Sequence, residues 1–416
     1  MSGAVAEGGG EEIPQKIEKK KEKKKKPLPT PVLHHHDEPG PVDLPLGKIV
    51  ARRWKVVDKL GEGGCGAVYL VQNTKNLQKA ALKAESNFVA GGSVLKLEVQ
   101  ILKKLIGRKY VAQLLTSGKK EKYGYMVMTV FGPSLSRIFK HCKREFSVST
   151  QIRLGMQILY GLKQLHEVGY VHRDVKPANF AIGLKGKESR VIHLLDFGLA
   201  REFVIKNEAG FLELRRPREN TLFRGTVKYC SVNSHKRAEQ GRPDDLWSMV
   251  YMLVEMRGPL PWDRSHDKHQ IGKIKKDVTD EDLLLKCPPQ MLEITAHLRE
   301  LDYYIRPDYL RIYSIFEDMM NVNGIKYSDL YDWEIERRPK GYGTAGSTDK
   351  LKGGKLRRKI SKILTVSEDV SMQKTSHVGE AQVSASINDK TSMQDESDEK
   401  QPPFSAEEFE KNELGF

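Results

Sequence analysis

The residues best suited to chemistry stand in the stretch HRDVKPAN at positions 172–179. Asp174 can accept a proton from an attacking hydroxyl, and Lys176 can neutralise the charge that builds on a transferred phosphoryl group. Asn179 offers an amide oxygen to Mg²⁺, and Asp196, in the later stretch LLDFGLA, offers a second ligand. These groups favour phosphoryl transfer, which requires positioned phosphates, metal ions and a base rather than covalent chemistry by the protein.

A glycine-rich stretch upstream has the spacing of a phosphate-binding loop. Gly61, Gly63 and Gly66 form the pattern GxGxxG, and glycines allow backbone N–H groups to approach phosphate oxygens closely. The motif alone is also compatible with a simple turn or with a Rossmann dinucleotide site. Because the glycines lie between two strand-like runs rather than before a helix, we favour a loop over the phosphates of ATP.

Two charged residues after the glycines could complete the phosphate site. Lys83 lies in the strand-like run AALKAE, and Glu98 lies in KLEVQILKKL, the one helix-like segment of this region. A lysine that contacts phosphates and is held by a glutamate is a recurrent arrangement in phosphotransferases. Each residue also has a simpler interpretation: Lys83 could face the solvent, and Glu98 could be a surface residue paired with a neighbour along its helix.

The elements that must position these groups change character near residue 131. Before it, short strand-like runs such as WKVVDKL, GAVYLVQN and YGYMVMTV surround a single amphipathic segment. After it, helical patterns dominate: TQIRLGMQILYGLKQLHEVG carries an apolar stripe, and DDLWSMVYMLVEM is apolar almost all round. We therefore expect an α+β fold with a small β-rich lobe at about 48–130 and a larger helical lobe at about 131–336.

The segments on either side of this body have a different composition. Residues 1–47 are rich in Gly, Pro and Lys, and residues 337–416 are first basic and then acidic. Such segments bury too little apolar surface to offset the entropy of ordering, so we expect both to be disordered tails. The acidic end of the second tail could fold onto the basic body as a weak autoinhibitor.

Composition excludes several classes of protein. The 416 residues are 38% hydrophobic, which allows a sizeable core, but no apolar run reaches the roughly 18 residues of a membrane span. The first 30 residues lack the apolar core of a secretory signal. Four widely separated cysteines argue against a disulfide scaffold or a zinc site and indicate a reducing compartment, so we expect a cytoplasmic protein.

The net charge of +15 points to an anionic partner, whether nucleic acid, a membrane surface or an acidic protein. Residues 48–336 carry +14 of it, whereas residues 1–47 sum to zero and residues 337–416 to +1. No RNP, KH or zinc-finger signature supports nucleic-acid binding. The lysine tract at 19–26 could still act as a nuclear-localisation signal or bind a polyanion.

The ordered set of motifs resembles that of eukaryotic protein kinases, and the sequences between the motifs are similar to the casein kinase I group. Within that group the chain most resembles the tau-tubulin kinase branch, through FRGTVKYCSVNSHKRAEQGRPDDLWSMVYMLVEMRGPLPW at 223–262. Ser231, Val232 and Asn233 stand where kinases at large have an APE tripeptide. The resemblance covers residues 50–334 and implies a bilobal protein kinase fold, Ser/Thr phosphorylation of proteins, and the cofactors ATP and Mg²⁺.

The resemblance assigns roles to further residues, matched motif by motif. Asp245 would hold the catalytic loop through backbone N–H groups, or alternatively cap its own helix. Thr226 would contact Asp174 and Lys176 beside the substrate hydroxyl. Leu60, Val68 and Ala81 would pack on the adenine, with Met128 as the gatekeeper. Thr129 to Phe131 would form the hinge. Arg224 and Lys228 would contact an acidic or phosphorylated substrate.

Some features depart from kinases at large and carry expectations of their own. The APE glutamate is missing, so other residues must brace the activation segment. This arginine-rich segment has no obvious phosphosite, and we expect activity without its phosphorylation. Gln270, between Lys268 and Lys273, stands near the second basic position of an anion pocket, and Cys65 at the glycine-loop tip is either a reactive thiol or a passive small residue.

Three function classes compete at this point. An active Ser/Thr protein kinase uses all the motifs, and the intact Asp174, Asn179 and Asp196 disfavour a pseudokinase scaffold. A basic nucleic-acid-binding or microtubule-binding protein is the third class, and such binding by the tails could coexist with kinase activity. We expect a monomeric kinase that acts on acidic or phosphorylated proteins in the cytoplasm or, through its lysine tract, in the nucleus.

Overall fold

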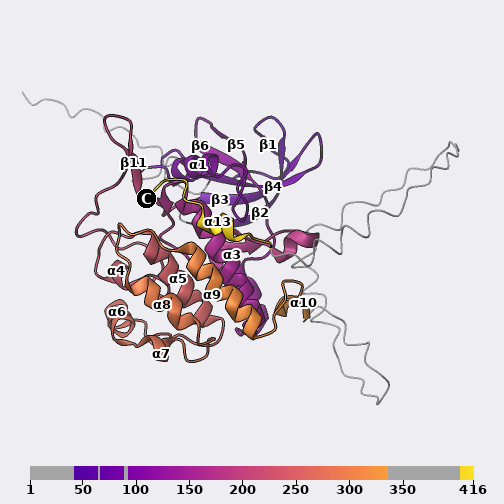
Figure 1. Ribbon diagram of the computed structural model, residues 1–416. Helices are drawn as coiled ribbons and strands as arrows, with labels where there is room; N and C mark the ends of the chain where they lie inside the picture. The colour runs from indigo at the N-terminus through magenta and orange to yellow at the C-terminus, as the bar shows by residue number, and fades with distance from the viewer. Residues whose placement is uncertain (1–41, 64–65, 89–91, 336–402) are drawn as a thin grey trace, which may run out of the picture. The chain divides into compact units, whose positions relative to one another are not determined.

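The computed structural model describes residues 42–63, 66–88, 92–335 and 403–416 (Figure 1). The expectations for residues 1–41, for residues 336–402 and for Cys65 lie outside these ranges and stay predictions. Within the described ranges, no helix is both long enough and apolar enough to cross a membrane.

An antiparallel sheet of six strands forms the first part of the body, in the order β1-β2-β3-β4-β6-β5. The strands are β1 (Ile49–Val50), β2 (Trp54–Gly63), β3 (Gly66–Asn73), β4 (Lys79–Ser86), β5 (Leu114–Lys119) and β6 (Tyr123–Met128). The β2–β3 hairpin carries the glycine-rich loop. Because side chains alternate along a strand, one face of the sheet can pack on a core while the other lines a site.

One face of this sheet builds its own core, in which Tyr69, Leu82 and Val127 are buried. Leu44 joins this core: its N–H donates to the Tyr69 hydroxyl at 3.0 Å, and that hydroxyl donates to the Val42 carbonyl at 2.6 Å. Residues 42–47, which composition assigned to the first tail, therefore pack on the sheet. Burial of Leu44 and the hydrogen bonds to the Tyr69 hydroxyl together hold this short stretch on the sheet.

The helix α1 (Val94–Lys104) lies against β4, β5 and β6. It begins after Ser93, whose side chain accepts a hydrogen bond from a backbone N–H of the first turn. Leu95 and Leu102 are buried on its inner side, as the amphipathic pattern indicates. The same side carries Glu98 into the interior.

Helices dominate the second part of the body (Figure 1). They are α2 (Leu135–His141), α3 (Val148–His166), α4 (Val232–His235), α5 (Arg242–Glu255), α6 (Lys268–Asp277), α7 (Asp280–Leu283), α8 (Met291–Arg299), α9 (Tyr309–Val322) and α10 (Asp332–Ile335). α3 is buried from Thr150 to its end and contacts both α5 and α9. Gly155 permits the close approach of α3 and α9, because a Cβ there would lie 2.7 Å from the Phe316 ring.

Short strands and 3₁₀ turns hold the loops between these helices. They are β7 (Tyr170–Val171), η1 (Pro177–Asn179), β8 (Phe180–Ile182), η2 (Gly186–Arg190), β9 (Ile192–Leu194), β10 (Arg201–Glu202), β11 (Val204–Lys206) and β12 (Leu212–Leu214). β7 pairs with β10, β8 with β9, and β11 with β12. The first two pairs bracket the stretches HRDVKPAN and DFG, so they fix the ends of both motifs.

Residues 403–416 differ from the expected tail. They contain the short helix α13 (Ala406–Glu410), yellow in Figure 1, which contacts α9. Phe404 and Phe409 are 3% and 0% exposed. The acidic composition of this end concealed these two apolar side chains, whose burial helps to bind it to the body.

Candidate active site

The catalytic loop gathers a carboxylate, an ammonium and a hydroxyl at one point. Asp174 Oδ2 lies 2.6 Å from Lys176 Nζ, and the Thr226 hydroxyl donates to Asp174 Oδ1 at 2.7 Å. Lys176 also donates to the Thr226 hydroxyl at 3.2 Å. A carboxylate held in this way can orient a substrate hydroxyl and accept its proton.

Asp245 holds the backbone of this loop from the first turn of α5. Its Oδ2 accepts the His172 N–H at 2.6 Å, and its Oδ1 accepts the Arg173 N–H at 2.8 Å. Arg173 has a φ of 65°, a conformation that L-residues rarely adopt, and these bonds offset its strain. Burial would raise the pKa of Asp245, but the hydrogen bond from His166 and the charges of both histidines outweigh burial and lower it.

Asp196 enters the site just after β9. Its own φ is 61°, and the Gly198 N–H donates to its Oδ1 at 3.3 Å. The buried Phe197 ring meets His172 edge-on, with centroids 5.7 Å apart, and His172 Nε2 lies 3.0 Å from the Leu195 carbonyl oxygen. These contacts fix the position of Asp196 relative to the catalytic loop.

Lys83 lies between two carboxylates. Its Nζ contacts Glu98 Oε1 directly and lies 3.9 Å from Asp196 Oδ1. Burial raises the pKa of Glu98, while the Lys83 ammonium acts in the opposite direction. Lys83 is 8% exposed and Glu98 2%, so neither is the surface residue of the simpler interpretation. An ammonium in this position is suited to the anionic oxygens of a polyphosphate.

The register of the sheet gathers the nucleotide-site candidates on one face. Val68 lies opposite Lys83, and Ala81 lies opposite Met128. Gly61 lies opposite Val68 in the β2–β3 pair. Directly opposed residues share a face, and every second residue of a strand returns to it. All five therefore lie on the face turned away from the core of the sheet.

The glycines of the loop have different local requirements. A Cβ on Gly61 or Gly63 would meet nothing within 4 Å, so both positions leave room for a ligand. Gly66 has a φ of 107°, and a Cβ there would come within 2.1 Å of the Ala84 carbonyl oxygen, so only glycine fits. Leu60, beside them, is 48% exposed, and its contact with an adenine stays a prediction.

The hinge candidates use their side chains within the protein. The Thr129 hydroxyl accepts the Gln113 N–H at 2.9 Å, and the Phe131 ring packs on His193 with centroids 4.6 Å apart. Thr129, Phe131 and His193 line a cavity of about 360 Å³ with Tyr110. Contacts between this hinge and an adenine would therefore come from backbone atoms.

Asn179 and Asp196 are the residues that could hold Mg²⁺. Asn179 Nδ2 donates to the Asp174 carbonyl oxygen at 2.8 Å, which leaves its Oδ1 as the atom suited to a metal. The Asp196 side chain is 49% exposed and thus accessible. An amide oxygen and a carboxylate are hard ligands that suit Mg²⁺ bound together with substrate phosphates. The donor set fits MgATP, with Lys83 as the contact to the phosphates.

The two substrate candidates on the activation segment have different surroundings. Lys228 Nζ lies 2.7 Å from Glu255 Oε1 and 2.8 Å from Asp263 Oδ1, so two carboxylates already neutralise it. Arg224 is exposed, two residues before Thr226. An added anion would find a more positive potential at Arg224 than at Lys228.

Arg224 belongs to a cluster of arginines around the catalytic loop. Burial, together with the charges of Arg201, Arg218 and Arg224, lowers the pKa of Arg173 to about 10. Glu239 partly compensates the cluster: its carboxylate lies 2.6 Å from Arg218 Nε and 3.2 Å from Arg201 Nε. Neither Glu239 nor these pairings were foreseen, because nothing local to Glu239 in the sequence identifies its partners.

Two further residues brace the activation segment where the APE glutamate is missing. Asp244 Oδ1 accepts the Ser231 hydroxyl at 2.5 Å, and burial raises the pKa of Asp244 to about 6. Lys275, 3% exposed, donates to the carbonyls of Val227 at 2.7 Å and Cys230 at 2.6 Å. The Asp doublet in RPDDLW could have indicated Asp244, whereas no sequence signal marks Lys275.

The region near Gln270 shows part of the expected second anion position. Gln270 Oε1 accepts the Ser265 hydroxyl at 2.7 Å, so its side chain is already engaged. The Lys268 ammonium lies 3.4 Å from the centroid of Phe223, a residue of the activation segment. A basic group therefore approaches the activation segment from α6, although its role in substrate binding stays a prediction.

This fold and this arrangement of groups define a protein kinase. The sequence pattern described as "Protein kinase domain" matches residues 54–308, and the chain belongs to this family. The α+β bilobal fold expected from the motifs is thereby confirmed. Use of ATP follows from membership of the family, and the donor set described above agrees with it.

The relatives define the type of kinase. A putative serine/threonine-protein kinase of Caenorhabditis elegans is 49% identical over 301 residues, which cover 72% of this chain and 87% of the relative. A probable serine/threonine-protein kinase of Dictyostelium discoideum is 40% identical over 297 residues, covering 71% of this chain and 59% of the relative. An inactive tau-tubulin kinase of C. elegans is 35% identical over 252 residues, 58% of this chain and 87% of the relative. The chain is a protein-serine/threonine kinase.

Proposed function

We propose that this kinase is an active, tau-tubulin kinase-like member of the casein kinase I group that phosphorylates Ser or Thr beside acidic or phosphorylated residues. The observation that carries the substrate preference is the cluster of Arg201, Arg218 and Arg224 around Arg173, next to the Asp174–Thr226 pair. Glu239 supplies one negative charge against these positive ones. The uncompensated charge favours an anionic group on the substrate.

The proposed roles follow from the positions of the groups. Bound MgATP supplies the transferable phosphoryl group. Asp174 takes the proton of the substrate hydroxyl, and Lys176 offsets the negative charge beside the reacting oxygen. Asn179 and Asp196 would hold the metal ion, and Lys83, held by Glu98, would contact the phosphates.

Activity can be separated from a scaffold role by one substitution. Asp174→Asn keeps the size of the side chain but removes the base, so phosphate transfer to protein should fall by a factor of about 100 or more while ATP binding persists. Asp277→Asn, at an exposed position near the end of α6, is the matched control. Equal transfer by the wild type and Asp174→Asn would contradict the proposal.

The substrate preference is tested with peptides that differ only in residues flanking one serine, which are neutral, acidic or phosphorylated. Arg224→Ala should lower kcat/KM about tenfold on the phosphorylated peptide, the value of one charge-assisted hydrogen bond, and little on the neutral one. Lys228→Ala should have a smaller effect because its charge is already paired. Arg311→Ala, exposed on α9, is the control. A wild type without preference among the peptides would refute the acidic-substrate proposal.

A further inference from the structure

Residues 403–416, here called the docking segment, bind the body through two aromatic side chains. Phe409 stacks on Tyr313 of α9, with centroids 4.2 Å apart and planes at 13°. Phe404 lies 5.0 Å from both Tyr110 and Tyr160, centroid to centroid. Aromatic anchors that are almost fully buried are typical of specific binding rather than of incidental contact.

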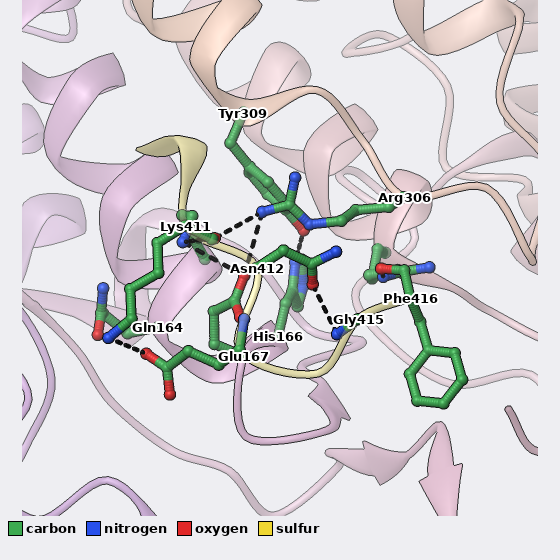
Figure 2. A network of polar contacts seen from close by, with 12 residues as sticks. Gln164, His166, Glu167, Arg306, Tyr309, Lys411, Asn412, Gly415 and Phe416 are labelled. Atoms are coloured by element: carbon green, nitrogen blue, oxygen red, sulfur yellow. Dashed lines mark hydrogen bonds and ion pairs between the residues drawn. The ribbon is translucent and has the colours of Figure 1, made fainter. Parts of the chain in front are cut away.

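Polar contacts continue from these anchors along α3. The Lys411 carbonyl oxygen accepts hydrogen bonds from Lys163 Nζ at 2.7 Å and from Arg306 Nη2 at 2.8 Å. The Glu413 N–H donates to Glu167 Oε2 at 2.6 Å, and Glu167 Oε1 also pairs with Arg306 at 3.2 Å. Figure 2 shows Glu167, Arg306 and Lys411 converging beside His166 and Tyr309. The docking segment thus meets groups that are buried and already oriented.

Glu413 also connects the docking segment to the loop between α1 and β5. Its two carboxylate oxygens contact the two terminal nitrogens of Arg108, with Oε1 2.9 Å from Nη1. Arg108 Nη1 also donates to Gln164 Oε1 of α3 at 3.0 Å. Such a bidentate pair is directional and holds the loop against α3.

The end of the docking segment lies beside the strands that flank the catalytic loop. Leu414 and Phe416 pack on the cluster of Val171, Phe203 and Val204, and the Phe416 carbonyl oxygen accepts a bond from Arg242 at 2.9 Å. Val171 directly precedes the catalytic loop, and Phe203 follows the paired strand β10. This end therefore packs on β7 and on the residues that directly follow β10.

The other end reaches the stretch that leads to Asp196. Tyr110, which contacts Phe404, has a φ of 60°, and packing of its ring against Phe404 and Tyr160 holds this strained conformation. The Tyr110 carbonyl oxygen accepts the N–H of Leu194, two residues before Asp196. The docking segment is thus connected to the stretch before Asp196 through Tyr110, and to the start of the catalytic loop through Val171.

The contacts of the docking segment do not involve the reacting groups. Among the described residues, the hydrogen bonds, ion pairs and ring contacts of the docking segment do not include Asp174, Lys176 or Asn179. The Lys83–Glu98 pair is formed while the segment is bound. A bound segment is therefore compatible with an active arrangement, which opposes the expected autoinhibitory role for this part of the acidic end.

We propose that the docking segment is an intramolecular activator: bound across the α1–β5 loop, α3 and the β7–β10 pair, it positions the catalytic loop and Asp196, and its release lowers activity. It is a positioning element, since it touches neither substrate nor cofactor. The inference rests on the kinase activity of the chain and not on its preference for acidic substrates.

The test uses the full chain with Glu413→Arg, Arg108→Glu and the combined charge swap. Glu410→Arg is the matched control, because Glu410 is an exposed glutamate of the same segment. Phosphate transfer is measured to casein, an acidic substrate, and to myelin basic protein, a basic one. Hydrogen exchange of residues 403–416 and of the α1–β5 loop reports release, and the melting temperature reports global stability.

We expect Glu413→Arg to lower kcat about tenfold on both substrates, within the usual range of coupling between sites, with a much smaller change in KM for ATP. Exchange should quicken at Glu413 and near Tyr110, and the charge swap should restore both readouts. Higher activity on release would make the segment an inhibitor, and unchanged activity with proven release would make it passive; both overturn the proposal. If Glu413→Arg leaves the segment protected, the double variant Phe404→Ala with Phe409→Ala is judged by the same criteria.

Discussion

Replacement of Glu239 by glutamine removes one negative charge from among the arginines beside the catalytic loop. The Glu239 side chain is 1% exposed, and its carboxylate lies 2.6 Å from Arg218 Nε and 3.2 Å from both Arg218 Nη2 and Arg201 Nε. Glutamine has nearly the same shape but a single acceptor oxygen, and its amide N–H groups would face a guanidinium. The substitution therefore breaks the pairs without opening a cavity.

The size of the effect follows from these contacts. Breaking a buried ion pair costs about 3–5 kcal/mol of folding free energy. Because Arg218 is half exposed, water can solvate its unpaired guanidinium, which reduces the expected cost to about 2–3 kcal/mol. For a domain of this size about 1 kcal/mol corresponds to about 2 °C, so the melting temperature should fall by about 4–6 °C. Gln240, the neighbour of Glu239, donates to the Arg224 carbonyl, so the substitution should also disturb the position of Arg224 beside the substrate. For this reason kcat/KM should fall about tenfold.

The effect should depend on pH in one direction. Burial would raise the pKa of Glu239, but the hydrogen bond from Arg218 and the charge of Arg201 outweigh burial and lower the pKa below 4.5. An acid whose pKa is lower in the folded state stabilises the fold above its unfolded pKa, and this contribution is lost as the pH falls through the folded value. The difference in melting temperature between wild type and Glu239→Gln should thus be full at neutral pH and shrink below about pH 4.5.

Differential scanning calorimetry at several pH values and steady-state kinetics at neutral pH measure both effects. Glu219→Gln is the matched control, because Glu219 is an exposed glutamate of the activation segment. If Glu239→Gln melts within about 1 °C of wild type and keeps its kcat/KM, Glu239 does not brace this segment and the reasoning fails.

Phosphatase treatment of the purified kinase should leave its activity unchanged, because Glu239 already pairs with Arg218 and Arg201; loss of activity would show that a phosphate is required. Lys275→Met should change the melting temperature little at neutral pH, since relief of the buried charge offsets two lost hydrogen bonds. Burial lowers the pKa of Lys275 from 10.5 to about 8, so between these pH values the unfolded chain binds more protons than the folded one. As the pH rises through this range, the wild type should therefore gain stability relative to Lys275→Met. A difference in melting temperature that stays flat or falls in calorimetry would contradict this. Deletion of residues 19–26 should remove any nuclear fraction of a fluorescently tagged chain, and an unchanged distribution in live cells would exclude a localisation role.

The parts of the site that could be predicted are those with local sequence signals. Asp174, Lys176 and Asn179 fall within one short stretch, where the chemistry of phosphoryl transfer restricts which residues can stand at each position. Lys83 and Glu98 were each ambiguous alone and were identified by their order relative to the other motifs. Their burial in the structure removes that ambiguity.

The parts that could not be predicted depend on which distant residues meet. Lys228 matched a substrate-binding position, but its pairing with Glu255 and Asp263 is a property of the packed helices and not of the motif. Glu408 bonds to Tyr160 across 248 residues, and no periodicity connects the two segments. Long-range contacts of this kind arise from shape and charge matching in three dimensions, which composition and spacing do not record.

The register of the sheet also determines where the length of the chain can vary. An insertion of one residue in β4 ahead of Lys83 would turn that side chain to the opposite face, into the core around Leu82, while the backbone ladder could still form. The exposed turn at 74–78, between β3 and β4, can absorb the same extra residue without changing any register. One extra residue is thus tolerated at this turn, only a few residues away from a position where it would remove Lys83 from the phosphate site.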